Sequence, residues 1–165
     1  MEYKYLIDTN VLITAHRQTY PMDIFPSFWE QLIEKGSSKI IFLDKVYDEI
    51  INNSGKSDAL KTWVSDNKNN FENIVSSDKD IISEYSEIAN EIQKSKRYED
   101  PAKHVYFDVA DSWICAAAKA KDLVIVTNEV SSNAKNRVKI PDVCEKFNIK
   151  YINSIKFIRE LGMRF

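Results

Sequence analysis

Apolar residues in this chain fall into short unbroken runs, and longer segments with helical spacing separate them. The runs over 3–7, 39–43 and 123–126 are too short for helices and have the continuous apolar character of buried strands. The segments 71–75 and 149–152 are weaker strand candidates. The pattern therefore predicts strands that are distributed along the whole chain and alternate with helical sequence.

Between the strands, apolar side chains recur three and four positions apart, which is typical of one face of a helix. Aspartate, serine and proline mark several helix starts, Ser154 is expected to cap the last helix, and Gly36 marks a helix end. Pro101 interrupts residues 97–106, which are expected to form a loop, and 131–139 reads as a polar loop. Helices are expected over 11–16, 25–36, 44–50, 58–67, 78–96, 108–121, 141–147 and 154–161, with a turn over 52–56.

Alternation of strands with helices is typical of an α/β protein with a mainly parallel sheet. We expect a three-layer α/β/α architecture, in which ligands bind at the carboxyl ends of the strands. The 165 residues, of which 44% are hydrophobic, suit a single domain over 1–165. Within it, 58–97 is predicted to be a helical insertion.

Charge and cysteine content narrow the function classes only slightly. The net charge is −2, so no basic excess marks the chain as a nucleic-acid binder, although a site that works through bound cations needs none. Cys115 and Cys144 lack metal-pair spacing, and Cys115 reads as a core residue. With no signal peptide and no run long enough to span a bilayer, a cytoplasmic location away from the membrane is expected.

Four carboxylates lie where the predicted elements would bring them to one edge of the sheet. Asp8 ends the first strand, and Glu129 follows the strand over 123–126. Asp111 lies early in the helix that leads into that strand, and Glu49 lies in the helix after the second strand. Like charges held close together are costly and a cation relieves that cost, so the arrangement predicts a metal site.

All of these candidate ligands are oxygen donors, which favour Mg²⁺ or Mn²⁺ over Zn²⁺ or Cu²⁺. Such ions polarise phosphoryl oxygens and generate hydroxide, which suits phosphodiester hydrolysis. Three of the carboxylates also have a purely structural interpretation: Asp8 as a helix cap, and Glu49 and Glu129 as surface residues. Asp108 is expected to cap the helix that carries Asp111. The joint placement of the four carboxylates favours a site.

The order of these motifs resembles the PIN-domain nucleases. Residues 5–12 (YLIDTNVL) are similar to the opening motif, and 46–50 (VYDEI) to the second acidic motif. The segment 111–118 (DSWICAAA) resembles the third motif, and 123–129 (LVIVTNE) the fourth. The segment 140–144 (IPDVC) looks like that of a bacterial and archaeal PIN-like subgroup of largely uncharacterised proteins.

The resemblance implies a metal-dependent endoribonuclease in which Asp8, Glu49 and Asp111 hold Mg²⁺ or Mn²⁺ and Glu129 either completes the shell or orients water. It also implies that Asn10 and Thr127 orient the carboxylates. Many PIN proteins are toxins of toxin–antitoxin pairs and act as homodimers, which implies RNA as substrate, an antitoxin partner and a homodimer.

The sequence departs from the family pattern at two places. Glu129 stands where the family usually has Asp, so its longer side chain either binds the ion through water or does not bind it. The segment 58–96 is longer than in compact members and is expected to form a helical clip or lid. The first departure leaves open a catalytically silent module that binds RNA or a protein.

Other functions and substrate contacts have less support. Phosphotransfer on Asp8 would need a second Asp two residues on, where Asn10 stands. Lys45, Arg17, Lys135 and Arg137 are candidates for phosphate contacts, although solvated surface charges are the commoner role. Tyr20, Trp29 and Trp63 are candidates for base stacking, although core packing is the commoner role.

Overall fold

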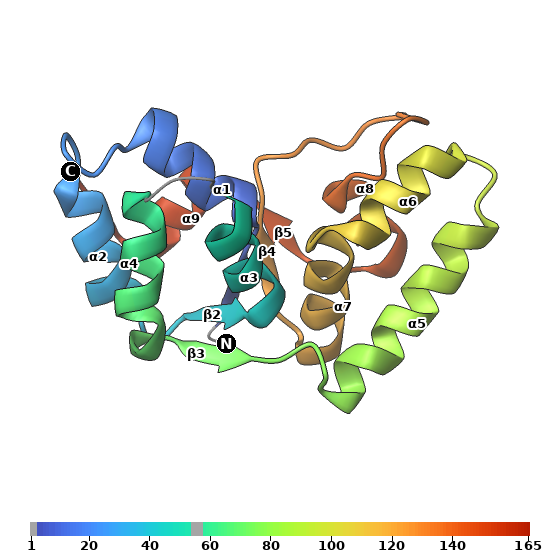
Figure 1. Ribbon diagram of the computed structural model, residues 1–165, viewed down its shortest axis with the longest axis horizontal. Helices are drawn as coiled ribbons and strands as arrows, with labels where there is room; N and C mark the ends of the chain where they lie inside the picture. Colours follow the sequence, from blue (N-terminus) through green and yellow to red (C-terminus); the bar gives the residue numbers. More distant parts are fainter. Residues whose placement is uncertain (1–2, 54–57) are drawn as a thin grey trace.

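A computed structural model of the chain describes residues 3–53 and 58–165, and the predicted turn over 52–56 falls largely outside them. Its centre is one sheet with strand order β3-β2-β1-β4-β5, in which every neighbouring pair is parallel (Figure 1). The strands are β1 (Tyr5–Ile7), β2 (Ile40–Leu43), β3 (Glu72–Ile74), β4 (Val124–Val126) and β5 (Tyr151–Ile152). The predicted α/β class with a parallel sheet is confirmed.

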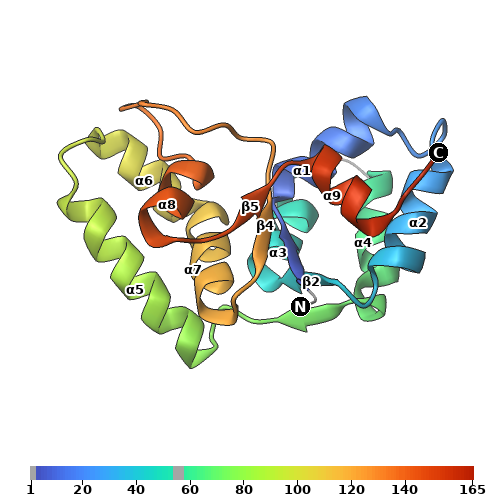
Figure 2. The ribbon, with the colours of Figure 1, turned by 180° about the vertical axis from the view of Figure 1, so that it is seen from behind.

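Helices flank the sheet in two groups, which lie on opposite sides of it in both Figure 1 and Figure 2. One group comprises α1 (Thr9–Thr14), α2 (Pro26–Gly36), α3 (Asp44–Asn53), α4 (Ala59–Asn67) and α9 (Ser154–Leu161). The other comprises α5 (Lys79–Lys94), α6 (Asp100–Asp108), α7 (Asp111–Lys121) and α8 (Ile140–Phe147). Short π-helical and 3-10 turns cover Ala15–Thr19 and Lys68–Asn70. The three-layer α/β/α architecture is confirmed.

The core lies between these layers because the three central strands are apolar on both faces. Every residue of β1, β2 and β4 is buried. Helix α7 presents a run of small buried residues that includes Cys115, Ala116 and Ala117, so other elements can approach it closely. Cys115 and Cys144 are both buried and free, as expected of small apolar core residues.

The strand order creates a switch point beside β1. From β1 the chain adds β2 and then β3 on one side, and it returns to add β4 and β5 on the other side. Connections that leave β1 and β4 therefore diverge at the carboxyl ends of these strands, where open α/β sheets bind ligands. Asp8 and Thr127 directly follow the two strands, so both residues lie at the edge of the sheet where such folds bind ligands.

Three expectations from the sequence are wrong. Residues 97–106 are mostly helical, because Pro101 stands in the first turn of α6, where no helical N–H is required. Asp108 is the last residue of α6 and does not cap α7, because the extended residue Val109 separates the two helices. Helix α9 is capped by Asn153 instead of Ser154, since the Asn153 side chain accepts the Lys156 N–H.

The segment 58–97 contributes to both the sheet and a helical layer. It contains α4, the edge strand β3 that pairs with β2, and α5, which packs along α7. None of its residues lines the large cleft described below, and the helical clip or lid over a substrate stays a prediction. Within the described residues, no helix has the length and hydrophobicity that crossing a bilayer requires.

Candidate active site

Asp8 is the most buried carboxylate at this edge, with 1% of its surface exposed. Its backbone N–H donates to the Val126 carbonyl at 2.9 Å, which ties the end of β1 to the end of β4. Its side chain caps α1 by accepting the Asn10 backbone N–H at 3.4 Å. The cap fixes the carboxylate at the junction of strand and helix, and the exposed Asn10 side chain lines the adjacent cleft.

Thr127 links Asp8 to Glu129. Its hydroxyl donates to Asp8 Oδ2 at 3.0 Å and accepts the Glu129 backbone N–H at 3.2 Å. Both bonds are local consequences of β4 ending at Val126, because the chain then turns away from the sheet beside Asp8. Thr127 therefore orients one carboxylate directly and positions the backbone of a second.

Asp111 and Glu49 approach the same edge from α7 and α3. Asp111 is the first residue of α7 and is 8% exposed. Glu49 Oε2 accepts the backbone N–H of Ala110 at 2.9 Å, so the Glu49 carboxylate is held at the N-terminal end of the helix that carries Asp111. This hydrogen bond joins α3 of one helical layer to the start of α7 in the opposite layer, beside β1.

These carboxylates are close enough to influence one another's ionisation. Burial, reinforced by the charge of Glu129, raises the pKa of Asp8 to about 6. Burial, together with the charges of Asp8, Glu129 and Glu49, raises the pKa of Asp111 to about 8. Negative charge on Asp8 and Asp111 is therefore unfavourable, and a bound cation would stabilise it.

The donor set suits a hard divalent cation. All four side chains offer carboxylate oxygens, and Glu129 Oε2 is buried without a hydrogen-bond partner. Glu49 and Glu129 each direct one oxygen at a protein donor, and among residues 3–53 and 58–165 no three acidic, His or Cys side chains are arranged so that they could hold a metal ion together. The chemistry of the residues therefore fits Mg²⁺ or Mn²⁺, while their arrangement is not that of a finished ligand shell.

Arg137 forms an ion pair with one of these carboxylates. Its Nη2 lies 3.3 Å from Glu129 Oε1, and its charge opposes the rise in the pKa of Asp111. The Arg137 side chain is 52% exposed, whereas that of Glu129 is 12% exposed. The pair thus lies at the border between the buried carboxylates and solvent.

The loop that carries Arg137 is anchored by a buried carboxylate on α8. Asp142 accepts hydrogen bonds from the Ser131 hydroxyl at 3.0 Å and from the Ser132 N–H at 3.0 Å. It also pairs with Arg97 at 3.2 Å, and Arg97 donates to the carbonyls of Ser132 and Ala134. These bonds hold the polar loop over 131–139 against α8 and against the segment between α5 and α6.

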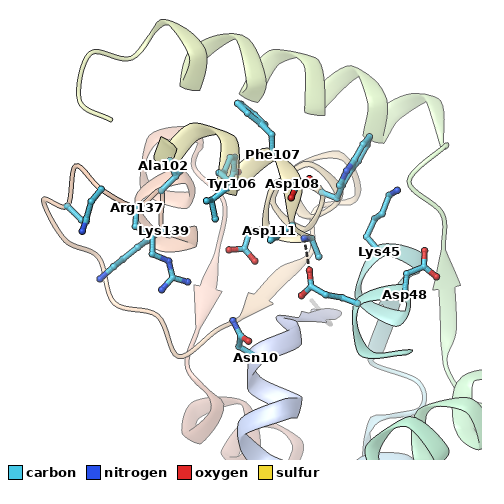
Figure 3. Close-up of a pocket in the computed structure, with 18 of the residues that line it drawn as sticks. Asn10, Lys45, Asp48, Ala102, Tyr106, Phe107, Asp108, Asp111, Arg137 and Lys139 are labelled. Carbon is cyan, nitrogen blue, oxygen red and sulfur yellow. Dashed lines mark hydrogen bonds between the residues drawn. The ribbon is translucent and has the colours of Figure 1, made fainter. Parts of the chain in front are cut away.

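A cleft of about 970 Å³ opens beside the carboxylates (Figure 3). Asp111 lies in its middle, Lys45 and Asp48 lie on one side, and Arg137 and Lys139 lie on the other. Its lining is drawn from the start of α1, from α3, from the α6–α7 junction and from the anchored loop. Of the four carboxylates, Glu49 and Asp111 line this cleft, whereas Asp8 and Glu129 do not.

Other candidates from the sequence lie elsewhere. Arg17 is 3.9 Å from Asp58, and Lys135 lies on the exposed loop, but neither lines the cleft. Trp29 is buried and packs edge-on against Trp63 with ring centroids 5.1 Å apart, and Tyr20 stacks on Phe28. These three aromatic residues belong to a packed cluster away from the site.

Sequence reasoning missed Trp113, which lines the cleft two residues after Asp111. The signal available was a large aromatic residue in the first turn of a helix whose other apolar residues are mostly small. Such a residue is ordinarily assigned to the core, so only the position of the cleft distinguishes it.

The strand order and the flanking helices give this chain a PIN-like fold. It is similar to VapBC2 from Rickettsia felis bound to a promoter DNA fragment, with 18% identity, a TM-score of 0.58, and 90% of this chain and 97% of that chain covered. It is similar to DNA-bound VapBC from Salmonella typhimurium, with 17% identity, a TM-score of 0.59 and coverage of 92% and 98%. It is also similar to FitAcB from Neisseria gonorrhoeae, with 15% identity, a TM-score of 0.50, and 90% of this chain and 96% of that chain covered.

Residues 5–165 match the family described as Domain of unknown function (DUF4411), and the chain belongs to that family. A comparison with curated protein sequences gives no match.

Proposed function

We propose that this protein is a metal-dependent endoribonuclease that hydrolyses RNA phosphodiester bonds. The observation that carries the proposal is the convergence of Asp8, Glu49, Asp111 and Glu129 at the switch point of a PIN-like sheet. Carboxylates that burial and mutual repulsion push towards protonation are characteristic of functional sites. A cleft with cationic flanks beside them suits a phosphodiester chain.

In this proposal Asp8, Glu49 and Asp111 hold the ion, and Glu129 completes the shell directly or through water. A bound Mg²⁺ or Mn²⁺ would polarise a phosphoryl oxygen and supply hydroxide from water. Thr127 and the α1 cap keep Asp8 in one orientation, and the Ala110 N–H does the same for Glu49. Pre-oriented ligands reduce the reorganisation that binding and catalysis require.

We further propose that the protein acts as the toxin of a toxin–antitoxin pair, with an antitoxin partner and a homodimeric assembly. The likeness in fold to VapBC and FitAcB complexes supports this proposal. A small gene directly upstream that encodes a DNA-binding pattern would support it further, whereas a solitary gene would speak against it.

RNA cleavage tests the proposed activity. Purified protein is incubated with single-stranded RNA in Mg²⁺, in Mn²⁺ and in EDTA, next to the variant Asp8→Asn. The proposal expects cleavage with either ion and loss of cleavage in EDTA and in the variant, because the buried ligand is then missing. Equal cleavage by parent and variant would assign the activity to a contaminant or to another site.

A catalytically silent module that binds RNA or a protein is the second candidate. The Arg137–Glu129 pair favours it, because a protein cation already stands beside one of the acidic positions. A titration with millimolar Mn²⁺, followed by thermal unfolding, separates the two functions, because an ion that binds the native state raises the melting temperature. An unchanged melting temperature with intact RNA binding would support the silent module, and metal-dependent cleavage would exclude it.

A further inference from the structure

We infer that Trp113 and Lys45 form a nucleotide subsite beside the carboxylates, at which one unpaired base of the substrate stacks on the indole and a phosphate contacts the ammonium. The inference rests on the proposed function, since it assigns the RNA a path through the same cleft. It adds that the recognised strand is unpaired at this position, because a base inside a duplex has both faces covered by its neighbours.

Neighbouring aromatic rings support the Trp113 indole, as a surface for base stacking requires. Its ring lies 3.9 Å from that of Tyr85 on α5, with only 19° between the planes. Phe107 packs near Tyr85 from α6, with ring centroids 6.4 Å apart. Trp113 and Phe107 line the cleft whereas Tyr85 does not. The indole is therefore backed on one face, and it is partly exposed at the cleft.

Lys45 supplies the positive charge at the same place. Its ammonium lies 5.5 Å from the centre of the Trp113 ring, and its side chain makes no ion pair within residues 3–53 and 58–165. Because Tyr85 covers one face of the indole, a base can stack only on the face over which the ammonium lies, so base binding moves the ammonium from the ring towards the phosphate. A cation–π contact holds a lysine without neutralising it, so the charge stays available to an anion.

The opposite flank of the cleft completes the path. In Figure 3, Arg137 and Lys139 lie on the far side of Asp111 from Lys45. A strand bound at both flanks crosses over Asp111 and continues in both directions. The phosphate between the flanks is then the one exposed to the carboxylates, which fits cleavage within a chain.

The test measures RNA binding separately from cleavage. A fluorescein-labelled single-stranded RNA of about ten nucleotides is titrated with the protein in Ca²⁺, and a gel confirms that the RNA stays intact. The variants are Trp113→Leu, Trp113→Phe and Lys45→Gln. The matched control is Lys68→Gln, because Lys68 makes a similar contact with Tyr47 at 4.2 Å but neither residue lines the cleft.

The inference expects roughly ten-fold weaker binding for Trp113→Leu and recovery of most of the affinity in Trp113→Phe. Lys45→Gln should bind more weakly and lower the slope of log affinity against log salt by about one. Lys68→Gln should bind as the parent does. Because Lys45→Gln leaves the packed aromatic residues in place, its result does not depend on how well Trp113→Leu folds.

The possible results distinguish the proposed subsite from the proposed cleavage activity. Loss of affinity in Trp113→Leu and Lys45→Gln supports the subsite even where no cleavage is found. Unchanged affinity in both overturns the subsite, and cleavage by the parent would then leave the proposed function standing. A parent that neither binds nor cleaves RNA overturns both.

Discussion

Thr127 shows how a single uncharged residue can organise a charged site. Its hydroxyl donates to Asp8 and accepts from the backbone of Glu129, so one side chain connects two acidic positions across the ends of β1 and β4. It is 1% exposed, so water cannot easily replace either bond. The orientation of the Asp8 carboxylate and the position of the Glu129 backbone thus depend on an uncharged residue.

We expect Thr127→Val to lose both hydrogen bonds while keeping the shape of the side chain. A buried acceptor without its donor costs about 1–3 kcal/mol of folding free energy. RNA cleavage should fall roughly ten-fold or more, as it does when a residue that orients a metal ligand is removed. Thr127→Ser, which keeps the hydroxyl, is the control, and cleavage by the valine variant at the parental rate would contradict the assigned role.

Protonation of the carboxylates makes stability depend on pH. Asp111 has a folded-state pKa of about 8 against 3.8 for a free carboxyl, so between these values the folded state holds more protons than the unfolded state. The stabilisation is complete below the unfolded value and is lost as pH rises through the folded value. Asp8 contributes in the same direction up to about 6.

Metal-free protein should therefore be less stable at about pH 8 than at about pH 5, by on the order of 2 kcal/mol. Urea unfolding in EDTA at the two pH values measures this difference. Asp111→Asn should reduce it, because the amide does not ionise. A parent that is more stable at the higher pH would show that these carboxyls are not destabilised by their surroundings.

At the scale of elements, the loop over 131–139 forms a wall of the cleft although it has no regular secondary structure. It is fastened by the buried carboxylate of Asp142 on α8 and by Arg97, which lies between α5 and α6. The Glu99 N–H also donates to the Lys135 carbonyl at 2.9 Å. Arg137 and Lys139 thereby reach the cleft from an anchored segment.

We expect Asp142→Asn to weaken the anchor by about 1.5–3 kcal/mol, since hydrogen bonds to a charged group contribute that much. The loop should become a preferred site of limited proteolysis, and KM for RNA should rise more than kcat falls. Lys4→Gln is the control, because the Lys4–Glu72 pair is half exposed and such pairs contribute little. Proteolysis and kinetics unchanged from the parent would show that the loop is held by other contacts.

At the scale of the molecule, the switch point of the sheet explains why the site lies where it does. Helices of opposite layers meet at the carboxyl ends of β1 and β4, and the Glu49 carboxylate bonds to the Ala110 N–H there. The site therefore belongs to the fold as a whole: Asp8 comes from the junction of β1 and α1, Glu49 from one helical layer and Asp111 from the other.

Much of this architecture can be predicted from the sequence, because apolar runs and helical periodicity depend on residues close together in the chain. The five strands and the acidic positions at their ends are readable in this way. Helix α6 is not, because Pro101 signals a break as readily as a helix start. The Arg97–Asp142 anchor and the cleft at Trp113 depend on contacts between distant segments, which no local pattern reports.

The most direct test of the account is the rate of RNA cleavage in Mn²⁺ by Asp111→Asn, measured beside the parent and Asp66→Asn. Asp66 is an exposed carboxylate on α4 that does not line the cleft, so it controls for the loss of one charge. We predict a loss of at least about 100-fold for Asp111→Asn, since metal catalysis contributes several kcal/mol, and none for Asp66→Asn. Equal rates for the parent and Asp111→Asn would contradict the proposed site.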